Sequence, residues 1–253
     1  MKKLSVAIAT FNEEAHIGRS LASVSGWADE IVLVDGGSRD NTVLIAKTFG
    51  AKIIETTNPP IFHINKQKAL DACSGIWILQ LDADEVVTHE LRNEIIKMID
   101  GNPKENGYYI SRRNYFLGHW LHKGGQYPDY VMRLFKRGKG WFPAKNIHEQ
   151  IVVEGPVGYL KEPLEHYSYR TMKDYWRKAD AYTSLTADEL ARVAEKKNIA
   201  SYIQYEIVMP VKTFLSIFLR HKGFLDGIYG FLFALFSALH YPIAYQKYRV
   251  RQK

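Results

Sequence analysis

The chain has 253 residues, of which 46% are hydrophobic and 24% charged, so it is typical of a globular protein with a sizeable core. Its single cysteine, Cys73, excludes an internal disulfide bond and favours a reducing compartment. The net charge is +7, and most of it lies from position 207 onward, where the sequence has seven basic residues and a single acid, Asp226. A cationic end of this kind favours an anionic partner, either nucleic acid or lipid.

Strands and helices alternate through the first hundred residues. Apolar runs predict strands at 4–10, 30–35, 51–55 and 76–82. The segments between and after them predict helices at 13–25, 41–49, 64–74 and 91–99. This alternation predicts an α/β fold, in which a mostly parallel, Rossmann-like sheet carries helices on both faces.

Polar clusters follow three of the predicted strands at their carboxyl ends, which is where ligands bind in such sheets. They are Thr10-Phe11-Asn12-Glu13, Asp35-Gly36-Gly37-Ser38 and Asp82-Ala83-Asp84-Glu85. We expect these clusters to converge on one crevice. The sequence contains neither Gly-x-Gly-x-x-Gly nor a Walker Gly-Lys-Ser/Thr loop, which argues against an NAD enzyme and a P-loop NTPase.

Asp82 and Asp84 flank one small residue directly after a hydrophobic strand. That spacing directs both carboxylates to one place, and oxygen ligands suit Mg²⁺ or Mn²⁺. A divalent ion there would neutralise the charge on a leaving diphosphate. Solvated loop acids explain most isolated Asp-x-Asp pairs, but the strand directly before this one favours a metal site.

The glycines after Asp35 allow two compatible interpretations. They suit a tight strand-to-helix turn, with Asp40 or Asn41 capping the following helix. They also let a flat base approach the backbone, with Asp35 accepting a hydrogen bond from a base N–H.

Residues 107–170 differ in character from the first hundred, with predicted strands at 108–116 and 130–136 and loops rich in Gly, His, Lys and Trp. From Thr171 the chain is predicted to be helical to its end. We therefore predict a catalytic domain over 1–170 and a helical region over 171–253. The N-terminal Met-Lys-Lys leads directly into a strand, so we expect no signal peptide. Cys73 lies in a predicted helix, which favours a packing role over a nucleophilic one.

The apolar stretch at 227–245 is marginal in length for a membrane span. Its apolar residues surround most of the helix, which suits burial in protein or in lipid. Flanking basic and tyrosine residues favour a monotopic anchor on an anionic membrane surface, so we expect a cytoplasmic protein attached peripherally to the inner face of the cell membrane. A helical hairpin forming a homo-oligomer interface and a plain intramolecular core are the alternatives. Nucleic acid is not expected, because apolar residues lie between the basic clusters.

Four blocks of the sequence carry a resemblance: Thr10-Phe11-Asn12-Glu13, Val34-Asp35-Gly36-Gly37-Ser38-x-Asp40-x-Thr42, Asn65-Lys66-Gln67-Lys68-Ala69-Leu70, and Leu81-Asp82-Ala83-Asp84-Glu85. Together they resemble the inverting family 2 glycosyltransferases with the GT-A fold. Three later patterns are Pro128-Asp129-x-x-x-Arg133-Leu134-Phe135, Asn146-Ile147-His148-Glu149 and Pro163-Leu164-x-His166-Tyr167-Ser168-Tyr169. They are similar to a narrower group, the bacterial lipopolysaccharide core glucosyltransferases of the WaaE/KdtX type.

The resemblance implies a set of donor-binding positions in this sequence, namely Thr10, Asn12, Glu13, Asp35, Gly36, Lys66, Asp82, Ala83, Arg133 and His148. By this resemblance, the first three would line the nucleoside pocket and Asp35 would read a uracil-like base. Lys66 would approach the base or the phosphates, and Arg133 would steady the diphosphate. Asp84 would bind the metal, while Asp82 would contact the ribose or the metal.

The resemblance also implies that Glu149 is the general base. Inverting transfer to a hydroxyl needs a carboxylate opposite the leaving diphosphate, which takes the acceptor proton. Asp129 is the second candidate, and a surface salt bridge is the plain alternative for both. His148 is a metal ligand, a phosphate contact or a structural residue, His63 and His166 are expected to be structural, and helix capping accounts for Glu85.

These expectations combine into a metal-dependent hexosyltransferase that uses Mg²⁺ or Mn²⁺. It would move a sugar from a UDP-sugar, with UDP-glucose expected, to a hydroxyl of a lipid-linked acceptor such as lipopolysaccharide core. The alternatives are a polyprenyl-phosphate glycosyltransferase, a sugar-phosphate nucleotidyltransferase and a non-catalytic scaffold that kept the fold. A scaffold has no need of Asp35, Asp84 and Glu149 together.

Overall fold

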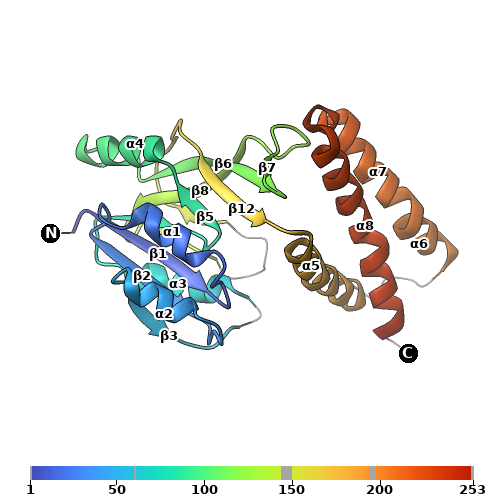
Figure 1. The fold of residues 1–253 in the computed structure, drawn as a ribbon, viewed down its shortest axis with the longest axis horizontal. Helices are drawn as coiled ribbons and strands as arrows, with labels where there is room; N and C mark the ends of the chain where they lie inside the picture. Colours follow the sequence, from blue (N-terminus) through green and yellow to red (C-terminus); the bar gives the residue numbers. More distant parts are fainter. Residues whose placement is uncertain (1, 60, 144–149, 194–197, 252–253) are drawn as a thin grey trace. The chain divides into compact units, whose positions relative to one another are not determined.

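The computed structural model describes residues 2–59, 61–143, 150–193 and 198–251. They form two compact units, Met1–Arg112 with Tyr130–His166, and Arg113–Asp129 with Tyr167–Lys253. The first unit holds most of the sheet, and the second holds the C-terminal helices (Figure 1). The second unit takes in 113–129 as well as the C-terminal region, and the domain division into 1–170 and 171–253 stays a prediction.

Four parallel strands make one half of the sheet in the order β3-β2-β1-β4. They are β1 (Leu4–Thr10), β2 (Glu30–Asp35), β3 (Lys52–Glu55) and β4 (Trp77–Gln80). The register sets Thr10 opposite Asp35, so the carboxyl ends of β1 and β2 meet at one edge. This half of the sheet confirms the predicted parallel arrangement.

The other half of the sheet is mixed in direction. β8 (Asp129–Lys136) runs antiparallel to β4 and is followed in order by β6 (Gly107–Phe116), β12 (Leu164–Tyr169) and β5 (Glu85–Val87). Four shorter described strands are β7 (His119–Trp120), β9 (Gly140–Trp141), β10 (Val152–Val153) and β11 (Val157–Tyr159). The sequence predicts β6 and β8 but none of the two- or three-residue strands, because these are too short to show a periodic pattern.

Helices cover both faces of the sheet, as predicted. Helices α1 (Ile17–Val24), α2 (Thr42–Thr48) and α4 (His89–Asp100) share one core with the side chains of Val6 and Ile8. Helix α3 (His63–Asp71) shares a second core with Ala7, which points to the opposite face of β1. The alternation along β1 therefore divides the interior of the first unit into two layers (Figure 1).

Cys73 lies in the second of these cores, directly after α3, and only 4% of its surface is exposed. Its thiol contacts the carbonyl oxygen of Ala69 at 3.2 Å. Burial raises the pKa of the Cys73 thiol to about 12, so it is protonated at neutral pH. The predicted packing role is confirmed.

The predicted helix at 13–25 begins only at Ile17. The backbone amides of residues 12–14 donate hydrogen bonds across to side chains in the 38–42 loop. These amides are therefore committed to the neighbouring loop, and helical geometry starts after them.

The described C-terminal region is helical from Thr171, as predicted, with breaks. It comprises α5 (Met172–Arg192), α6 (Ile199–Ile203), α7 (Met209–Leu215) and α8 (Gly227–Arg251). Two π-helical turns, Gln204–Val208 and Ser216–Arg220, flank α7, and a 3₁₀ turn, Gly223–Asp226, precedes α8. Helix α8 packs against both α5 and α7 (Figure 1).

Among the described residues, one helical stretch, Gly223–Val250, has the length and composition to cross a membrane. Part of its apolar surface is buried in protein instead. Phe233 and Phe236 on α8 pack edge-on against Phe116, and Tyr245 and Tyr248 pack against Leu190 of α5. The intramolecular core therefore accounts for a share of the apolar residues in α8.

Candidate active site

The loops that follow β1 and β2 brace each other. The amide of Asn12 donates to Ser38 Oγ, and the amide of Glu13 donates to Thr42 Oγ1, each at 2.8 Å. In return, the amide of Arg39 donates to Asn12 Oδ1 at 2.8 Å. The two predicted donor-binding loops therefore form one hydrogen-bonded rim at the carboxyl edge of the parallel strands.

Asp35 is the buried centre of this rim, with 2% of its surface exposed. Its Oδ2 accepts the amides of Gly37 and Ser38 at 2.9 and 2.8 Å. Its Oδ1 accepts the hydroxyls of Thr10 and Ser38 at 3.2 and 2.5 Å. Through these four hydrogen bonds, Asp35 holds the loop after β2 against the end of β1. Recognition of a nucleotide base by Asp35 stays a prediction.

Gly36 occupies a position where a side chain has little room. A Cβ there would lie 3.2 Å from Asn58 Cβ and 3.3 Å from the carbonyl oxygen of Thr10. The amide of Gly36 donates to that same carbonyl at 2.8 Å, which fixes the turn after β2. The glycine therefore serves a close backbone approach, as the turn interpretation predicted.

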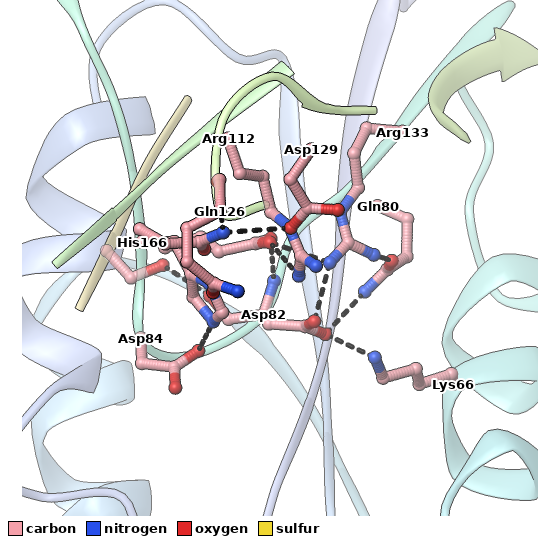
Figure 2. Close-up of polar contacts among 12 residues, drawn as sticks. Lys66, Gln80, Asp82, Asp84, Arg112, Gln126, Asp129, Arg133 and His166 are labelled. Carbon is pink, nitrogen blue, oxygen red and sulfur yellow. Dashed lines mark hydrogen bonds and ion pairs between the residues drawn. The ribbon is translucent and has the colours of Figure 1, made fainter. Parts of the chain in front are cut away.

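Arg133 on β8 is the cationic centre of the cluster around the Asp-x-Asp motif (Figure 2). Its guanidinium donates to Asp82 Oδ2 at 2.6 Å, to Glu85 Oε1 at 2.7 Å and to the side-chain oxygen of Gln80. Only 7% of the Arg133 side chain is exposed. Arg133 was predicted to steady a diphosphate, but the described contacts are with the motif itself.

Burial alone would raise the pKa of the Asp82 carboxyl, but the charges of Arg133 and Lys66 outweigh it and hold that pKa well below its usual range. The two carboxylates beside Arg133 likewise raise the pKa of its guanidinium against the effect of burial. Since the folded pKa of Asp82 is depressed, its contribution to stability is present above the unfolded value of about 3.9 and is lost as pH falls through the folded pKa.

The prediction that Glu85 caps a helix is wrong. Glu85 begins β5 and is fully buried, and its Oε2 accepts the amide of Asp82 at 2.9 Å. Arg112 Nη1 lies 3.5 Å from its Oε1, on the same oxygen that Arg133 contacts. The cap of α4 is Thr88, whose side chain accepts from the following turn. Glu85 therefore anchors the backbone of the motif to two arginines.

Asp84 has a different partner from Asp82. Its Oδ1 lies 3.5 Å from Nε2 of His166, and 13% of the Asp84 side chain is exposed. His166 is opposite Glu85 in the antiparallel pairing of β12 with β5, which brings its ring to the motif. Figure 2 shows the two aspartates turned toward separate groups, Asp82 toward Lys66 and Arg133, and Asp84 toward His166.

This geometry fits a divalent ion at Asp84 better than at Asp82. A carboxylate oxygen and an imidazole nitrogen are both ligands that Mn²⁺ accepts. Both oxygens of Asp82 already contact cationic or amide groups of Lys66, Arg133 and Gln80. The residues present therefore fit the implied metal, and Asp84 is the carboxylate that would hold it.

Lys66 lies near the start of α3 between aromatic rings and the motif. Its ammonium contacts Asp82 Oδ1 and lies 5.2 Å from the ring centroid of Phe62 and 5.9 Å from that of Phe142. The ring of His63 stacks on Phe142 at 4.7 Å, a structural contact of the kind predicted for it. Aromatic faces and a carboxylate thus hold the cation at one place.

The remaining predicted residues fall in three settings. Ala83 is buried in the first core, so its backbone alone is available to a donor. Asp129 belongs to the second unit, where its Oδ2 accepts the side-chain amide of Asn114 at 3.0 Å. His148 and Glu149 lie outside the described residues.

Comparison with known proteins decides the family. Residues 5–167 match the sequence model of the family described as glycosyl transferase family 2. The chain belongs to glycosyltransferase family 2. The match covers the strands and loops that carry the motifs, so the resemblance found in the sequence is confirmed.

Relatives of this glycosyltransferase cover nearly its whole length. It is 30% identical over 253 residues to the lipopolysaccharide core biosynthesis glycosyltransferase LpsC of Rhizobium meliloti, with 94% of this chain and 88% of the relative covered. It is 28% identical over 251 residues to an uncharacterized glycosyltransferase of Rickettsia typhi, with 94% and 84% covered.

A solved structure supports the fold. The glycosyltransferase is similar to residues 1–349 of S. aureus TarS in complex with UDP-GlcNAc, with a TM-score of 0.52 and 16% identity. The similarity covers 92% of this chain and 79% of that one. The GT-A type of α/β fold predicted from the sequence is therefore confirmed.

The sequence missed two members of the cluster in this glycosyltransferase. His166 was expected to be structural, yet it lies against Asp84, and Arg112 was not singled out at all although it approaches Glu85. The Pro163-Leu164-x-His166 pattern was the available signal for His166. Arg112 gave no local signal, because its place depends on how β6 lies in the sheet.

We predict that Arg133→Gln lowers the free energy of unfolding by about 3–5 kcal/mol, because removing one partner leaves buried carboxylates uncompensated. Urea denaturation followed by circular dichroism measures the change. The matched control is Arg137→Gln directly after the same strand, an exposed residue expected to change stability by no more than about 0.5 kcal/mol. Equal stability of the two variants would show that Arg133 does not hold the cluster.

Proposed function

We propose that this family 2 glycosyltransferase moves a hexose, with glucose expected, from a UDP-sugar to a hydroxyl of a lipid-linked saccharide such as lipopolysaccharide core. The observation that carries the proposal is the Asp82–Asp84 motif, whose two carboxylates have separate partners beside a braced loop rim. The similarity to a lipopolysaccharide core biosynthesis glycosyltransferase supports the acceptor class.

On the donor side, Asp84 with His166 is proposed to hold Mg²⁺ or Mn²⁺. When bound, the ion neutralises charge on the leaving diphosphate. Lys66 is 12% exposed at its side chain and already sits on Asp82, so it is the cation proposed to meet a donor phosphate. Asp82, held between two cations, is proposed to accept from the ribose hydroxyls. Thr10, Asn12 and the Asp35 loop are proposed to form the nucleoside side of the site.

On the acceptor side, we retain Glu149 as the proposed general base and His148 as a proposed phosphate contact. A carboxylate is needed because the acceptor hydroxyl must lose its proton as it attacks the sugar carbon from the side opposite the diphosphate. Asp129 is the second candidate. Its carboxylate accepts from Asn114, a contact that also suits a positioning role.

Two other reactions differ in measurable ways. A polyprenyl-phosphate glycosyltransferase uses a lipid phosphate as acceptor, which is ionised already and has no need of Glu149. A nucleotidyltransferase releases pyrophosphate rather than a nucleoside diphosphate, and family membership argues against it.

We predict that Mn²⁺ increases the stabilisation of the protein by UDP-glucose, and that Asp84→Asn removes this increase. Ligand binding raises stability by mass action, by about 2.7 kcal/mol at 100 times the dissociation constant, so thermal unfolding reports it. Other UDP- and GDP-sugars, measured in parallel, identify the donor. The control is Asp71→Asn, an exposed acid of α3. An undiminished Mn²⁺ effect in Asp84→Asn would rule out this metal site.

We predict that Glu149→Gln lowers the turnover of UDP-glucose with extracted lipopolysaccharide-core acceptor by about 10²- to 10⁴-fold, since a general base contributes that much. Binding of UDP-glucose should stay unchanged, because the base acts on the acceptor. Asp129→Asn tests the second candidate in the same assay. Normal turnover in Glu149→Gln, or transfer to a polyprenyl phosphate instead, would contradict the assignment.

We also propose that the enzyme docks on an anionic membrane through one face of its C-terminal helices. Exposed apolar side chains recur there at every fourth position, at Ile199, Ile203, Ile207, Val211, Leu215 and Leu219. A π turn holds more residues than an α turn, so a four-residue spacing stays on one face for longer. Phe214 and Phe218 point the other way, toward Phe231 of α8.

Cations lie on this apolar face. Lys212 and Arg220 line the same groove as Ile207, Val211 and Leu215, a groove of about 640 Å³. The described residues that line this groove include these two cations and no acid, and apolar side chains beside cations suit the headgroup region of an anionic leaflet. A lipid-linked acceptor presents its hydroxyl at that same interface.

We predict that Lys212→Glu with Arg220→Glu weakens binding to phosphatidylglycerol vesicles by at least about 30-fold, because each cation near an anionic surface contributes about 1 kcal/mol. Vesicle sedimentation measures the binding. The control reverses two exposed cations of α5, Arg177→Glu with Arg192→Glu. Unchanged binding would refute the docking face, and a dimer that dissociates in the test variant would favour the oligomer interface instead.

A further inference from the structure

A second group of metal-type ligands lies in the second unit and includes none of the predicted donor-site residues. It consists of His119 on β7, His122 two residues after that strand, and Asp226 directly before α8. One ligand atom from each residue lies within 4.8 Å of the other two. Two imidazoles and a carboxylate are a common ligand set for zinc with an open position.

The distances suit coordination of one small ion. His122 Nδ1 lies 3.3 Å and His119 Nε2 lies 3.7 Å from the same oxygen of Asp226, Oδ1. Zinc binds imidazole nitrogen and carboxylate oxygen at about 2.0–2.2 Å, so neighbouring ligand atoms of a tetrahedral site are about 3.4 Å apart. The distances from Asp226 Oδ1 to the two imidazole nitrogens, 3.3 and 3.7 Å, lie on either side of that value.

Asp226 is held in place by the backbone of the opposing loop. Its Oδ1 accepts the amide of His122 at 3.1 Å, and its Oδ2 accepts the amide of Lys123 at 2.9 Å. Only 6% of Asp226 is exposed, so this is a buried carboxylate and not a solvated surface acid. Hydrogen bonds that orient a ligating carboxylate are a regular feature of metal sites.

Both histidine rings pack against aromatic neighbours. His119 stacks on Tyr229 of α8, with ring centroids 4.6 Å apart and planes at 6°. The ring of His122 is tilted by 44° against that of Trp120, with ring centroids 3.8 Å apart. The Nε2 atom of His119 is buried and has no hydrogen-bond partner within the described part of the chain. A buried polar atom normally has a partner. A hydrogen-bonded His122–Asp226 pair alone leaves this nitrogen unexplained, whereas a metal ion at the cluster would engage it.

We propose that His119, His122 and Asp226 bind a divalent transition metal, with Zn²⁺ as the best fit to two nitrogens and one oxygen. The ion cross-links the β7 segment to the start of α8 within the second unit. It also accounts for Asp226, the one acid in a stretch of the sequence that is otherwise basic and apolar.

The test measures zinc binding on the metal-stripped, full-length protein carrying no polyhistidine tag. Calorimetric titration with ZnCl₂ gives the affinity, and elemental analysis after dialysis gives the number of ions retained. His119→Gln with His122→Gln removes two of the three ligands. Asp84→Asn removes zinc bound at the Asp-x-Asp motif. His221→Gln is the matched control. This exposed histidine lies beside Gly125, three residues after His122 in the chain, but it does not belong to the cluster.

We expect one tightly held zinc in the wild type, in Asp84→Asn and in His221→Gln. In the double histidine variant, zinc affinity should fall by more than about 100-fold. Loss of a residue that only hydrogen-bonds to a metal ligand costs about 10- to 100-fold, so a larger fall indicates loss of the ligands themselves. Zinc should also raise the melting temperature of the wild type but not of that variant. Equal zinc affinity in the double variant, or loss of the ion in Asp84→Asn, would overturn the proposal. Should the double variant fail to fold, His122→Gln replaces it, since that side chain is 49% exposed.

Discussion

The arrangement of the candidate site depends on the ionic contacts of the Arg133 guanidinium with Asp82 and Glu85. Arg133 lies on β8, the strand at which the sheet changes from parallel to antiparallel, and it reaches Asp82 and Glu85 beyond the end of β4. Buried charges of this kind are stable only while their partners remain in place. The two halves of the sheet are therefore joined by an ionic contact as well as by backbone hydrogen bonds, and the Asp-x-Asp motif lies at the junction.

This contact also separates the two aspartates of the motif. Asp82 serves the internal charge balance, because Arg133 and Lys66 both contact it, whereas Asp84 faces His166. In the sequence one residue separates the two aspartates, and this spacing suggested that both carboxylates bind the same group. Their neighbours give them different electrostatic surroundings, which is how adjacent acids of one type come to suit different tasks.

The parallel half of the fold was predictable because its signal is local. The strands at 4–10 and 30–35 have the predicted bounds, since a buried parallel strand is a continuous apolar run between polar turns. The late start of α1, the anchoring of Glu85 and the approach of Arg112 and His166 all depend on contacts between distant segments. A single sequence shows the residues but not these pairings. The proposed base, Glu149, came from resemblance alone.

The four-residue recurrence of apolar side chains from Ile199 to Leu219 places a constraint on chain length as well as on composition. Adding or removing one residue within this run would turn every later member by about 100° around the helix axis. The outward face would then be cut into two stripes that point in different directions, although no apolar residue had been lost. Tolerance to substitution in this region should therefore be far greater than tolerance to insertion or deletion.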